Sequence, residues 1–246
     1  MIKMIAAVCR RPGMTHAEYV AYVVQIHGAI SRENPVTLRR YVQNHTFDAA
    51  FGTSAESEHG MPLSRDSVTE LYWDSLESMG QTFADDYVRT KVGPDARNFA
   101  DQSVSLSLVA VEAEQPVVNP RAGAGAKVMH FLRAAPGLAL EDFFARWAKA
   151  HELALQAAPV AAATVRRCVH SQQLPQANAM LAYFNAKDAA IYEGVASLWY
   201  DDPASIGAFR AYEQALLDLN SRPETAFYEP SRSFFLYTTE VDILGN

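Results

Sequence analysis

The sequence contains two diverged copies of one unit, and this duplication limits the folds open to it more than any other feature. A shift of 124 residues aligns the start of the second copy with the first without a gap. Six identities fall in that stretch: Lys3 with Lys127, Pro12-Gly13 with Pro136-Gly137, Ala21 with Ala145, His27 with His151 and Pro35 with Pro159. At an offset of 127, Arg40 aligns with Arg167 and Tyr72-Trp73 with Trp199-Tyr200. Such a chain is expected to fold as two related halves.

Each copy has the order strand, helix, strand, strand, helix, strand. In the first copy the hydrophobic pattern predicts strands over residues 2–9, 38–47, 67–73 and 103–111, and helices over 15–32 and 75–90. In the second copy it predicts strands over 127–133, 164–171, 193–200 and 232–240, and helices over 140–156 and 203–220. Thr15 and Glu18 form a capping box at the start of the first helix. The apolar stripe of that helix comprises Tyr19, Val23, Ile26, His27 and Ile30.

This order is that of a ferredoxin-like unit, in which two helices cover one face of a four-stranded antiparallel sheet. The strands are apolar on both sides, so the other face of each sheet also needs cover. We therefore expect an α+β protein in which two tandem β-α-β-β-α-β units close face to face into an intramolecular barrel. The units would span residues 1–112 and 127–246, joined by a Pro-, Gly- and Ala-rich linker over 113–126.

Charge and composition exclude several kinds of partner. The net charge is −7 and no basic run is clustered, which argues against nucleic acid. No stretch has the ~18–20 apolar residues of a membrane span, and the N-terminal apolar run is too short for a signal peptide, so we expect a cytoplasmic protein. Cys9 and Cys168 fit small buried side chains in a reduced compartment and have no metal-site spacing. No fingerprint for phosphate, nicotinamide or flavin binding is present.

Three motifs of the first copy occur together: the turn Arg10-Arg11-Pro12-Gly13-Met14-Thr15, the helical His27-Gly28, and the strand Arg40-Tyr41-Val42-Gln43-Asn44-His45. In this combination the chain resembles the EthD family of the dimeric α/β barrel superfamily, strongly in the first copy and more weakly in the second. The resemblance implies ligand pockets between sheet and helices. It also implies an activity in the breakdown of ethers and other xenobiotics or in aromatic polyketide processing. Val23 departs from the family, which usually has tryptophan there.

His27 and His151 are the main candidates for chemistry because each lies on an apolar helix stripe that should face the sheet. A neutral imidazole in such a place can act as a general acid or base. The alternative is a core histidine that is bonded to a backbone carbonyl. The first copy is the better candidate for a reactive site, since the second copy has Gln172 where the first has His45.

The strand that follows the first helix supplies further polar candidates. Its alternation places Tyr41, Gln43 and His45 on one face and Asn44 on the other, and one of these faces should meet His27. We expect catalytic roles for His27, His45 and Tyr41. Six residues are candidates for substrate binding, although core packing is an alternative role for the aromatic ones: Asn44, Tyr19, Tyr22, Trp73, His151 and Trp147.

The expected function is a cofactor-independent enzyme for a small hydrophobic or aromatic carbonyl compound. His27 would transfer protons in a decarboxylation, elimination or isomerisation, as a lyase or isomerase of aromatic or xenobiotic catabolism. A general oxidoreductase is the alternative enzyme class. Two further alternatives are a heme protein with His151 or His170 as axial ligand, and a non-catalytic accessory protein that binds such compounds. No metal is expected, and a homodimer stays open.

Overall fold

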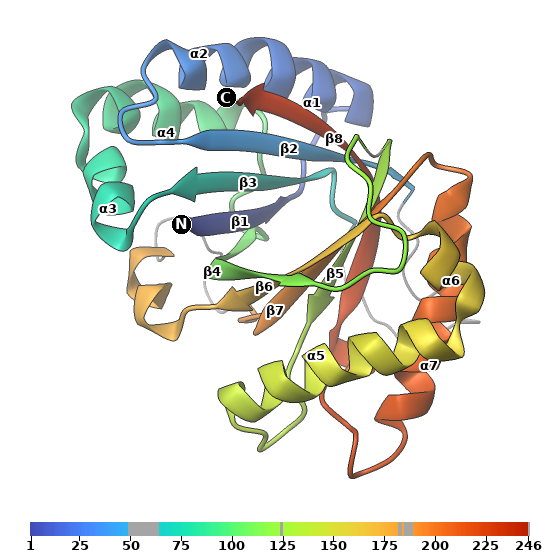
Figure 1. Ribbon diagram of the computed structural model, residues 1–246. Helices are drawn as coiled ribbons and strands as arrows, with labels where there is room; N and C mark the ends of the chain where they lie inside the picture. Colours follow the sequence, from blue (N-terminus) through green and yellow to red (C-terminus); the bar gives the residue numbers. More distant parts are fainter. Residues whose placement is uncertain (49–63, 124, 182–183, 185–188, 246) are drawn as a thin grey trace.

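The computed structural model describes residues 1–48, 64–123, 125–181, 184 and 189–245. Eight antiparallel strands form one closed barrel with helices on its outer surface (Figure 1). The strands of the first half are β1 (Ile2–Val8), β2 (Arg40–Asp48), β3 (Ser67–Trp73) and β4 (Leu106–Gln115). Those of the second half are β5 (Ala126–Leu132), β6 (Arg167–Gln173), β7 (Gly194–Tyr200) and β8 (Phe234–Leu244).

The order around the barrel is β1-β3-β2-β8-β5-β7-β6-β4. Within each half the order is therefore that of a ferredoxin-like sheet, since β4-β1-β3-β2 corresponds to β8-β5-β7-β6. The halves join where β2 pairs with β8 and where β4 pairs with β6. This closure confirms the expected fold of two fused ferredoxin-like units, and it leaves neither sheet with a free edge.

The α-helices of each half cover their own sheet, on opposite sides of the barrel (Figure 1). In the first half a continuous helix comprises α1 (His16–Tyr22), the π-helical turn η1 (Val23–His27) and α2 (Gly28–Glu33). The second helical stretch comprises α3 (Leu76–Ala84), the π-helical turn η2 (Val88–Val92), α4 (Gly93–Asp95) and the 3₁₀ turn η3 (Ala96–Asn98). The second half has α5 (Leu140–Ala157), α6 (Pro159–Thr164), η4 (Pro175–Leu181), η5 (Ser205–Ala208), α7 (Phe209–Asn220) and η6 (Pro230–Arg232). One 3₁₀ turn of the second half, η4, packs instead on the first half, where Ala177 and Leu181 join a cluster with Trp73 and Met79. None of the described helices is long and apolar enough to cross a membrane.

The first helix confirms one local prediction and corrects another. The Thr15 side chain accepts from the Glu18 backbone, and the Glu18 side chain accepts from the Thr15 backbone, so the capping box is present. Ile26, in contrast, is 46% exposed although the expected stripe includes it. The π-helical turn widens the helix at this point, and this changes which side chains face the sheet.

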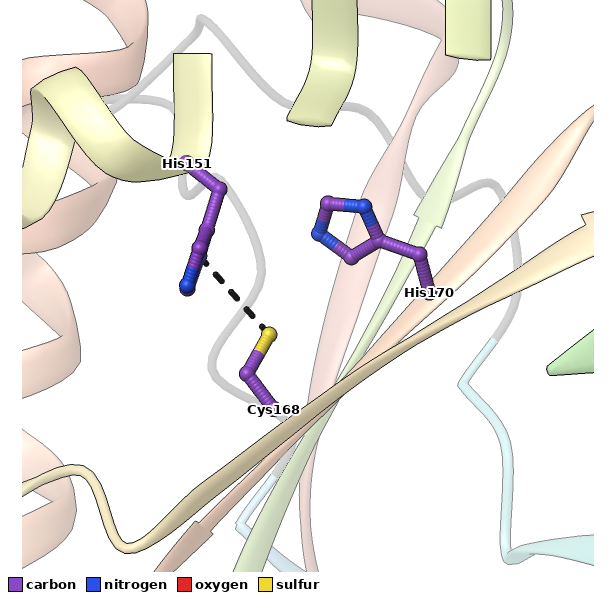
Figure 2. Close-up of side chains that lie close together, drawn as sticks. All are labelled: His151, Cys168 and His170. Atoms are coloured by element: carbon purple, nitrogen blue, oxygen red, sulfur yellow. Dashed lines mark hydrogen bonds between the residues drawn. The ribbon is translucent and has the colours of Figure 1, made fainter. Parts of the chain in front are cut away.

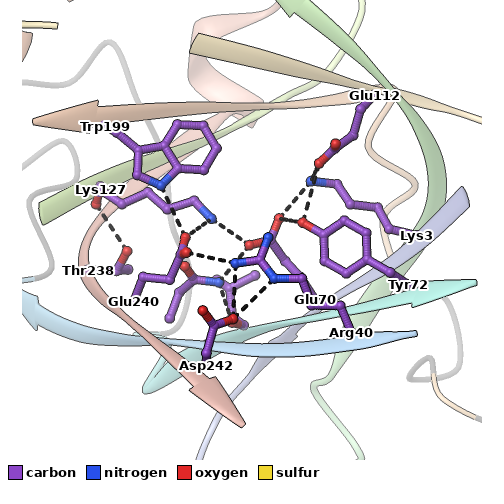
Figure 3. Close-up of polar contacts among 12 residues, drawn as sticks. Lys3, Arg40, Glu70, Tyr72, Glu112, Lys127, Trp199, Thr238, Glu240 and Asp242 are labelled. Atoms are coloured by element: carbon purple, nitrogen blue, oxygen red, sulfur yellow. Dashed lines mark hydrogen bonds and ion pairs between the residues drawn. The ribbon is translucent and has the colours of Figure 1, made fainter. Parts of the chain in front are cut away.

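The barrel interior is apolar at one end and charged at the other, which the apolar appearance of the strands did not predict. Lys3 and Lys127, equivalent residues of the two copies, both bind the buried Glu70, at 2.6 and 2.5 Å. Each lysine binds a second carboxylate as well: Lys3 contacts Glu112 at 2.8 Å and Lys127 contacts Glu240 at 3.0 Å (Figure 3). The paired carboxylates compensate the cost of burying two ammonium groups.

Several boundaries differ from the expected ones for tertiary reasons. β4 continues to Gln115, into the segment expected as linker, because it pairs with β6 across the junction of the halves. Pro159 begins the extra short helix α6, since proline is favoured in the first turn of a helix. The helix expected over 203–220 starts as the 3₁₀ turn η5 before α7.

Candidate active site

A cavity of about 460 Å³ lies in the first half, between the outer face of its sheet and its helices. Its wall is mainly apolar and includes Met4, Ala6, Leu71, Trp73, Val92 and Phe99. The polar side chains that reach it include those of His27, Tyr41, Gln43 and Thr69. A cavity of this size with a few convergent polar groups is typical of a site for a small hydrophobic molecule.

His27 lies in the π-helical turn η1, at the wall of this cavity. Its Nδ1 atom is 2.9 Å from Oδ2 of Asp95, which belongs to α4 on the second helical stretch. Tyr22 and Asn98 both donate to the other carboxylate oxygen of Asp95, at 2.7 and 2.9 Å. Asp95 is thus held in one orientation, and it accepts the Nδ1 hydrogen of His27. This tautomer leaves Nε2 with its lone pair.

The protonation states suit a base. Burial lowers the pKa of His27 below its usual value, and this outweighs the hydrogen bond and charge of Asp95, which raise it. Burial also raises the pKa of Asp95, but the hydrogen bonds from Tyr22, Asn98 and His27 lower it overall. At neutral pH the pair is therefore a neutral imidazole beside a carboxylate. An imidazole in that state accepts a proton.

A chain of hydrogen bonds along β2 holds Tyr41 beside the cavity. The Gln43 amide nitrogen donates to the Tyr41 hydroxyl at 2.7 Å and to the Val23 carbonyl at 2.9 Å. The Gln43 amide oxygen lies 2.9 Å from Nε2 of His45. Burial raises the pKa of Tyr41 to about 12, so its hydroxyl keeps its hydrogen at neutral pH and can donate it.

The structure brings together some of the residues expected at the site and separates others. Tyr19 and Trp73 line the cavity together with His27 and Tyr41. Tyr22 contacts Asp95. His45 binds Gln43 from outside the lining, and burial, with the nearby His16, lowers its pKa to about 4.

Asn44 faces the opposite side of β2, in the barrel interior, and donates to the Val68 carbonyl and to Glu70. The alternation along β2 explains this direction, since Tyr41, Gln43 and His45 point toward the helices. The position separates Asn44 from His27 and from the cavity. Its contacts are those of a structural residue of the charged network.

The second half has the same framework, but aromatic side chains fill it. Trp147 aligns with Val23, and its indole stacks on His170 with ring centroids 3.7 Å apart. It also lies against Gly194, where an added Cβ would be only 2.5 Å from the ring. His170 and Gly194 are the counterparts of Gln43 and Ser67, which line the cavity of the first half. The indole therefore occupies the place that Val23 leaves open.

His151, the counterpart of His27, is fully buried. Its Nε2 atom lies 2.9 Å from the Pro116 carbonyl oxygen and its Nδ1 atom 2.9 Å from the Tyr212 hydroxyl. These are the contacts of a core histidine, and they place His151 and Trp147 away from the first-half cavity.

Two residues of the site were not among the candidates from the sequence. Asp95 lies 68 residues from His27 in the sequence, and no motif marks it. Gln43 shares a strand face with Tyr41, and this alternation is the one sequence signal that could have found it.

The fold and the site define a class: a fused dimeric α/β barrel with a ligand cavity beside a helical histidine. The EthD domain model matches residues 11–103 and 135–218, one segment in each half, and the chain belongs to the EthD family. This confirms the resemblance seen in the sequence motifs.

Solved structures with low sequence identity share the fold. An anthrone oxidase-like protein has a TM-score of 0.56 and 11% identity, over 98% of this chain and 91% of that chain. A mutant chlorite dismutase from Candidatus Nitrospira defluvii has a TM-score of 0.54 and 12% identity, over 98% of this chain and 92% of that chain. A search of curated protein sequences found no match.

Proposed function

We propose that the chain is a cofactor-independent enzyme that transfers a proton to or from carbon in a small hydrophobic, carbonyl-bearing substrate. The observation that carries the proposal is the His27–Asp95 pair at the wall of a mainly apolar cavity of about 460 Å³. Membership of the EthD family is consistent with a role in the breakdown of aromatic or xenobiotic compounds.

His27 is the proposed base. Its Nε2 lone pair removes a proton from the carbon next to the substrate carbonyl, and Asp95 stabilises the imidazolium that forms. The electrons of the broken C–H bond move onto the carbonyl oxygen to give an enolate. Return of the proton to another carbon completes an isomerisation, and loss of a leaving group completes an elimination. In a decarboxylation the C–C bond to the carboxylate breaks, CO₂ departs and the electrons of this bond form the enolate. A proton taken up from solvent and passed on by His27 then reaches the carbon.

Tyr41 is the proposed donor to the developing enolate oxygen. Its ring meets that of His27 edge to face, with centroids 6.5 Å apart, and both side chains line the same cavity. Gln43 donates to the Tyr41 oxygen, and Thr69 is a second hydrogen-bonding side chain at this hydroxyl. A donor such as Tyr41 stabilises the charge that develops in the transition state. His45 holds Gln43 in place and is therefore a positioning residue in this scheme.

The cavity also suggests which substituents the substrate carries. Trp73 and Phe99 provide flat apolar surface for an aromatic ring. Arg89, on η2, is the one arginine or lysine among the described residues that line the cavity. Its guanidinium suits an acidic substituent such as a carboxylate. An aromatic keto acid fits both features.

The heme alternative can be tested against the residues named for it. His170 and His151 are both fully buried, and the His170 ring stacks on Trp147 with centroids 3.7 Å apart. A porphyrin does not fit between side chains packed in this way. The absorption spectrum of the purified protein should therefore lack a Soret band, and such a band would contradict the cofactor-independent proposal.

Deuterium uptake tests the proposal before the natural substrate is known. Aryl ketones and aryl keto acids are incubated with the protein in D₂O, and NMR follows loss of the proton next to the carbonyl. We expect His27→Ala to slow this exchange by about 10²–10⁴-fold. The matched control is His16→Ala, since His16 lies outside the cavity lining and binds Asp66. An equal exchange rate in His27→Ala and in the native chain would contradict the proposal.

Two other outcomes point to other functions. Oxygen uptake that accompanies exchange would favour the oxidoreductase alternative, in line with the name of the anthrone oxidase-like structure. Ligand binding with no exchange, decarboxylation or elimination would favour an accessory binding protein. An oxygen electrode and a thermal-shift assay with the same compounds distinguish these outcomes.

A further inference from the structure

A second cluster of reactive side chains lies in the second half, away from the cavity. His151 comes from α5, and Cys168 and His170 come from β6 (Figure 2). All three residues are fully buried. One ligand atom from each, two imidazole nitrogens and a thiol sulfur, lies within 4.8 Å of the others. One of these contacts is a hydrogen bond, which joins Cys168 Sγ to His151 Nδ1 at 3.7 Å.

The contacts of His151 determine which of its nitrogens can bind a ligand. Nε2 lies 2.9 Å from the Pro116 carbonyl oxygen, which can only accept, so Nε2 carries the hydrogen. Nδ1 therefore carries the lone pair. It faces the Tyr212 hydroxyl and the Cys168 thiol, both of which can donate. A metal-binding histidine is usually fixed in the same way, by a hydrogen bond from its other ring nitrogen to a carbonyl or carboxylate.

His170 supplies an independent observation. Neither of its ring nitrogens has a hydrogen-bond partner among the described residues, although the side chain is fully buried. A buried polar group without a partner costs about 1–3 kcal/mol. Trp147 covers one face of the ring, and His151 meets it edge-on with centroids 5.5 Å apart. An unpaired nitrogen of His170 lies in the same small volume as the Cys168 thiol and the His151 lone pair.

We propose that His151, Cys168 and His170 form a binding site for a monovalent soft metal ion, Cu(I). Thiolate and imidazole are ligands that Cu(I) accepts readily. When the ion binds, the Cys168 S–H bond breaks, a Cu–S bond forms and the proton leaves to solvent. No electron is transferred. One positive charge replaces another, so the net charge of the buried cluster does not change.

The charge balance distinguishes Cu(I) from Zn²⁺. With one thiolate and two neutral imidazoles, Zn²⁺ would leave a net positive charge in a core that contains Trp147 and Leu198. A buried charge without a partner is costly. The three ligand residues include no carboxylate that could compensate it. Cu(I) with one thiolate and two neutral imidazoles has no net charge, so this cost does not arise.

The geometry requires only small adjustments. Metal–sulfur and metal–nitrogen bonds of about 2.0–2.3 Å place ligand atoms about 3.5–4.3 Å apart. The three atoms, within 4.8 Å of one another, therefore need to approach by about 1.3 Å at most. The same framework positions carry His27, Tyr41 and Gln43 in the first half, where they line the cavity. The two copies thus present different chemistry from equivalent places.

The test is an anaerobic titration of the full-length protein with Cu(I), in competition with a chromophoric Cu(I) chelator. We expect the native chain to withdraw one Cu(I) from the chelator, and Cys168→Ser and His170→Phe to bind at least about tenfold more weakly. Cys9→Ser is the matched control because Cys9 is also buried but contacts Ser64 and Arg65 instead of histidines. Retention of full binding in Cys168→Ser, or its loss in Cys9→Ser alone, would overturn the proposal.

A measurement on the native chain guards against variants that fail to fold. X-ray absorption of the copper-loaded protein should show one sulfur and two nitrogen neighbours at the metal. A spectrum without a sulfur neighbour would contradict the site. Displacement of the bound copper by an equal concentration of Zn²⁺ would contradict the assignment to a monovalent ion. Because binding releases the thiol proton, the affinity for Cu(I) should also rise with pH.

Discussion

The Nδ1 atom of His27 lies 2.9 Å from the Oδ2 atom of Asp95, although 68 residues separate them in the sequence. Two π-helical turns, η1 and η2, belong to the helical stretches that carry these residues. Such turns interrupt α-helices frequently at functional sites. The contact gives the imidazole a fixed tautomer, and the proposed chemistry depends on it.

The pH dependence of the reaction follows from the state of His27. Burial lowers its pKa below the usual 6.5, so the base form predominates at neutral pH. The rate should rise with pH and reach its plateau by about pH 7, because the imidazole must be neutral to accept a proton. Asp95→Asn should lower the plateau by about tenfold or more, since an amide can hold the wrong tautomer. A rate profile of both proteins checks this, and an unchanged plateau in Asp95→Asn would contradict it.

Removal of the Tyr41 hydroxyl tests the donor to the enolate. Tyr41→Phe keeps the ring that lines the cavity but removes the O–H group, so kcat should fall by about 10²-fold with little change in KM. Steady-state kinetics of the exchange reaction measure both constants. If kcat is unchanged and KM rises instead, Tyr41 only helps to bind the substrate.

The packing of Trp147 in the second half makes a prediction about stability. An added Cβ at Gly194 would lie 2.5 and 2.8 Å from two carbons of the buried indole, which has no room to move. Gly194→Ala should therefore lower the free energy of unfolding by about 1–3 kcal/mol. Gly207→Ala is the control, because nothing lies within 4 Å of a Cβ there. Urea denaturation measures the free energy of unfolding of both variants. Equal values would show that the indole can shift to make room for the added methyl group.

Glu70 is expected to make the barrel sensitive to acid. Burial alone would raise its pKa, but Lys127 and Lys3 lower it well below the usual 4.5. A carboxyl group whose pKa is lower in the folded than in the unfolded state stabilises the protein at pH values above the unfolded-state pKa. This stabilisation is lost as the pH falls below about 4.5 toward the folded-state pKa. Glu70→Gln leaves two buried ammonium groups with less compensation, so it should destabilise the protein by about 3–5 kcal/mol at pH 7. Urea denaturation should show that the difference in free energy of unfolding between Glu70→Gln and the native chain shrinks below pH 4. A constant difference would contradict this explanation.

The duplication predicted the architecture because a repeat constrains the whole chain. Residues 67–73 and the order of elements in both halves agree with the structure, and the equivalent Lys3 and Lys127 meet at one carboxylate. Periodicity could not show the π-helical turn that exposes Ile26, since the predicted stripe follows an α-helical repeat. It also could not show where β4 ends, because its last residues pair with the other half.

The candidate site was only partly accessible from the sequence. Alternation along β2 correctly grouped Tyr41 with His45, but it could not decide which face meets the helices. Asp95 and the cluster of His151, Cys168 and His170 depend on contacts between separate elements, so no local spacing marks them. The sequence showed that this chain has valine at position 23, where the family usually has tryptophan. That this leaves an open cavity in one half only became clear from the way Trp147 packs in the other half.

Val23→Trp tests most directly the claim that the reaction takes place in the first-half cavity. The larger side chain should occupy cavity space beside Gln43 and Ser67, the counterparts of His170 and Gly194, although Ser67 has a side chain where the second half has glycine. His27 and Asp95 should keep their contact. We predict that this variant remains folded and that its deuterium uptake with aryl ketones is as slow as that of His27→Ala. Uptake at the native rate in a folded Val23→Trp protein would show that the chemistry lies elsewhere, and would contradict the proposed site.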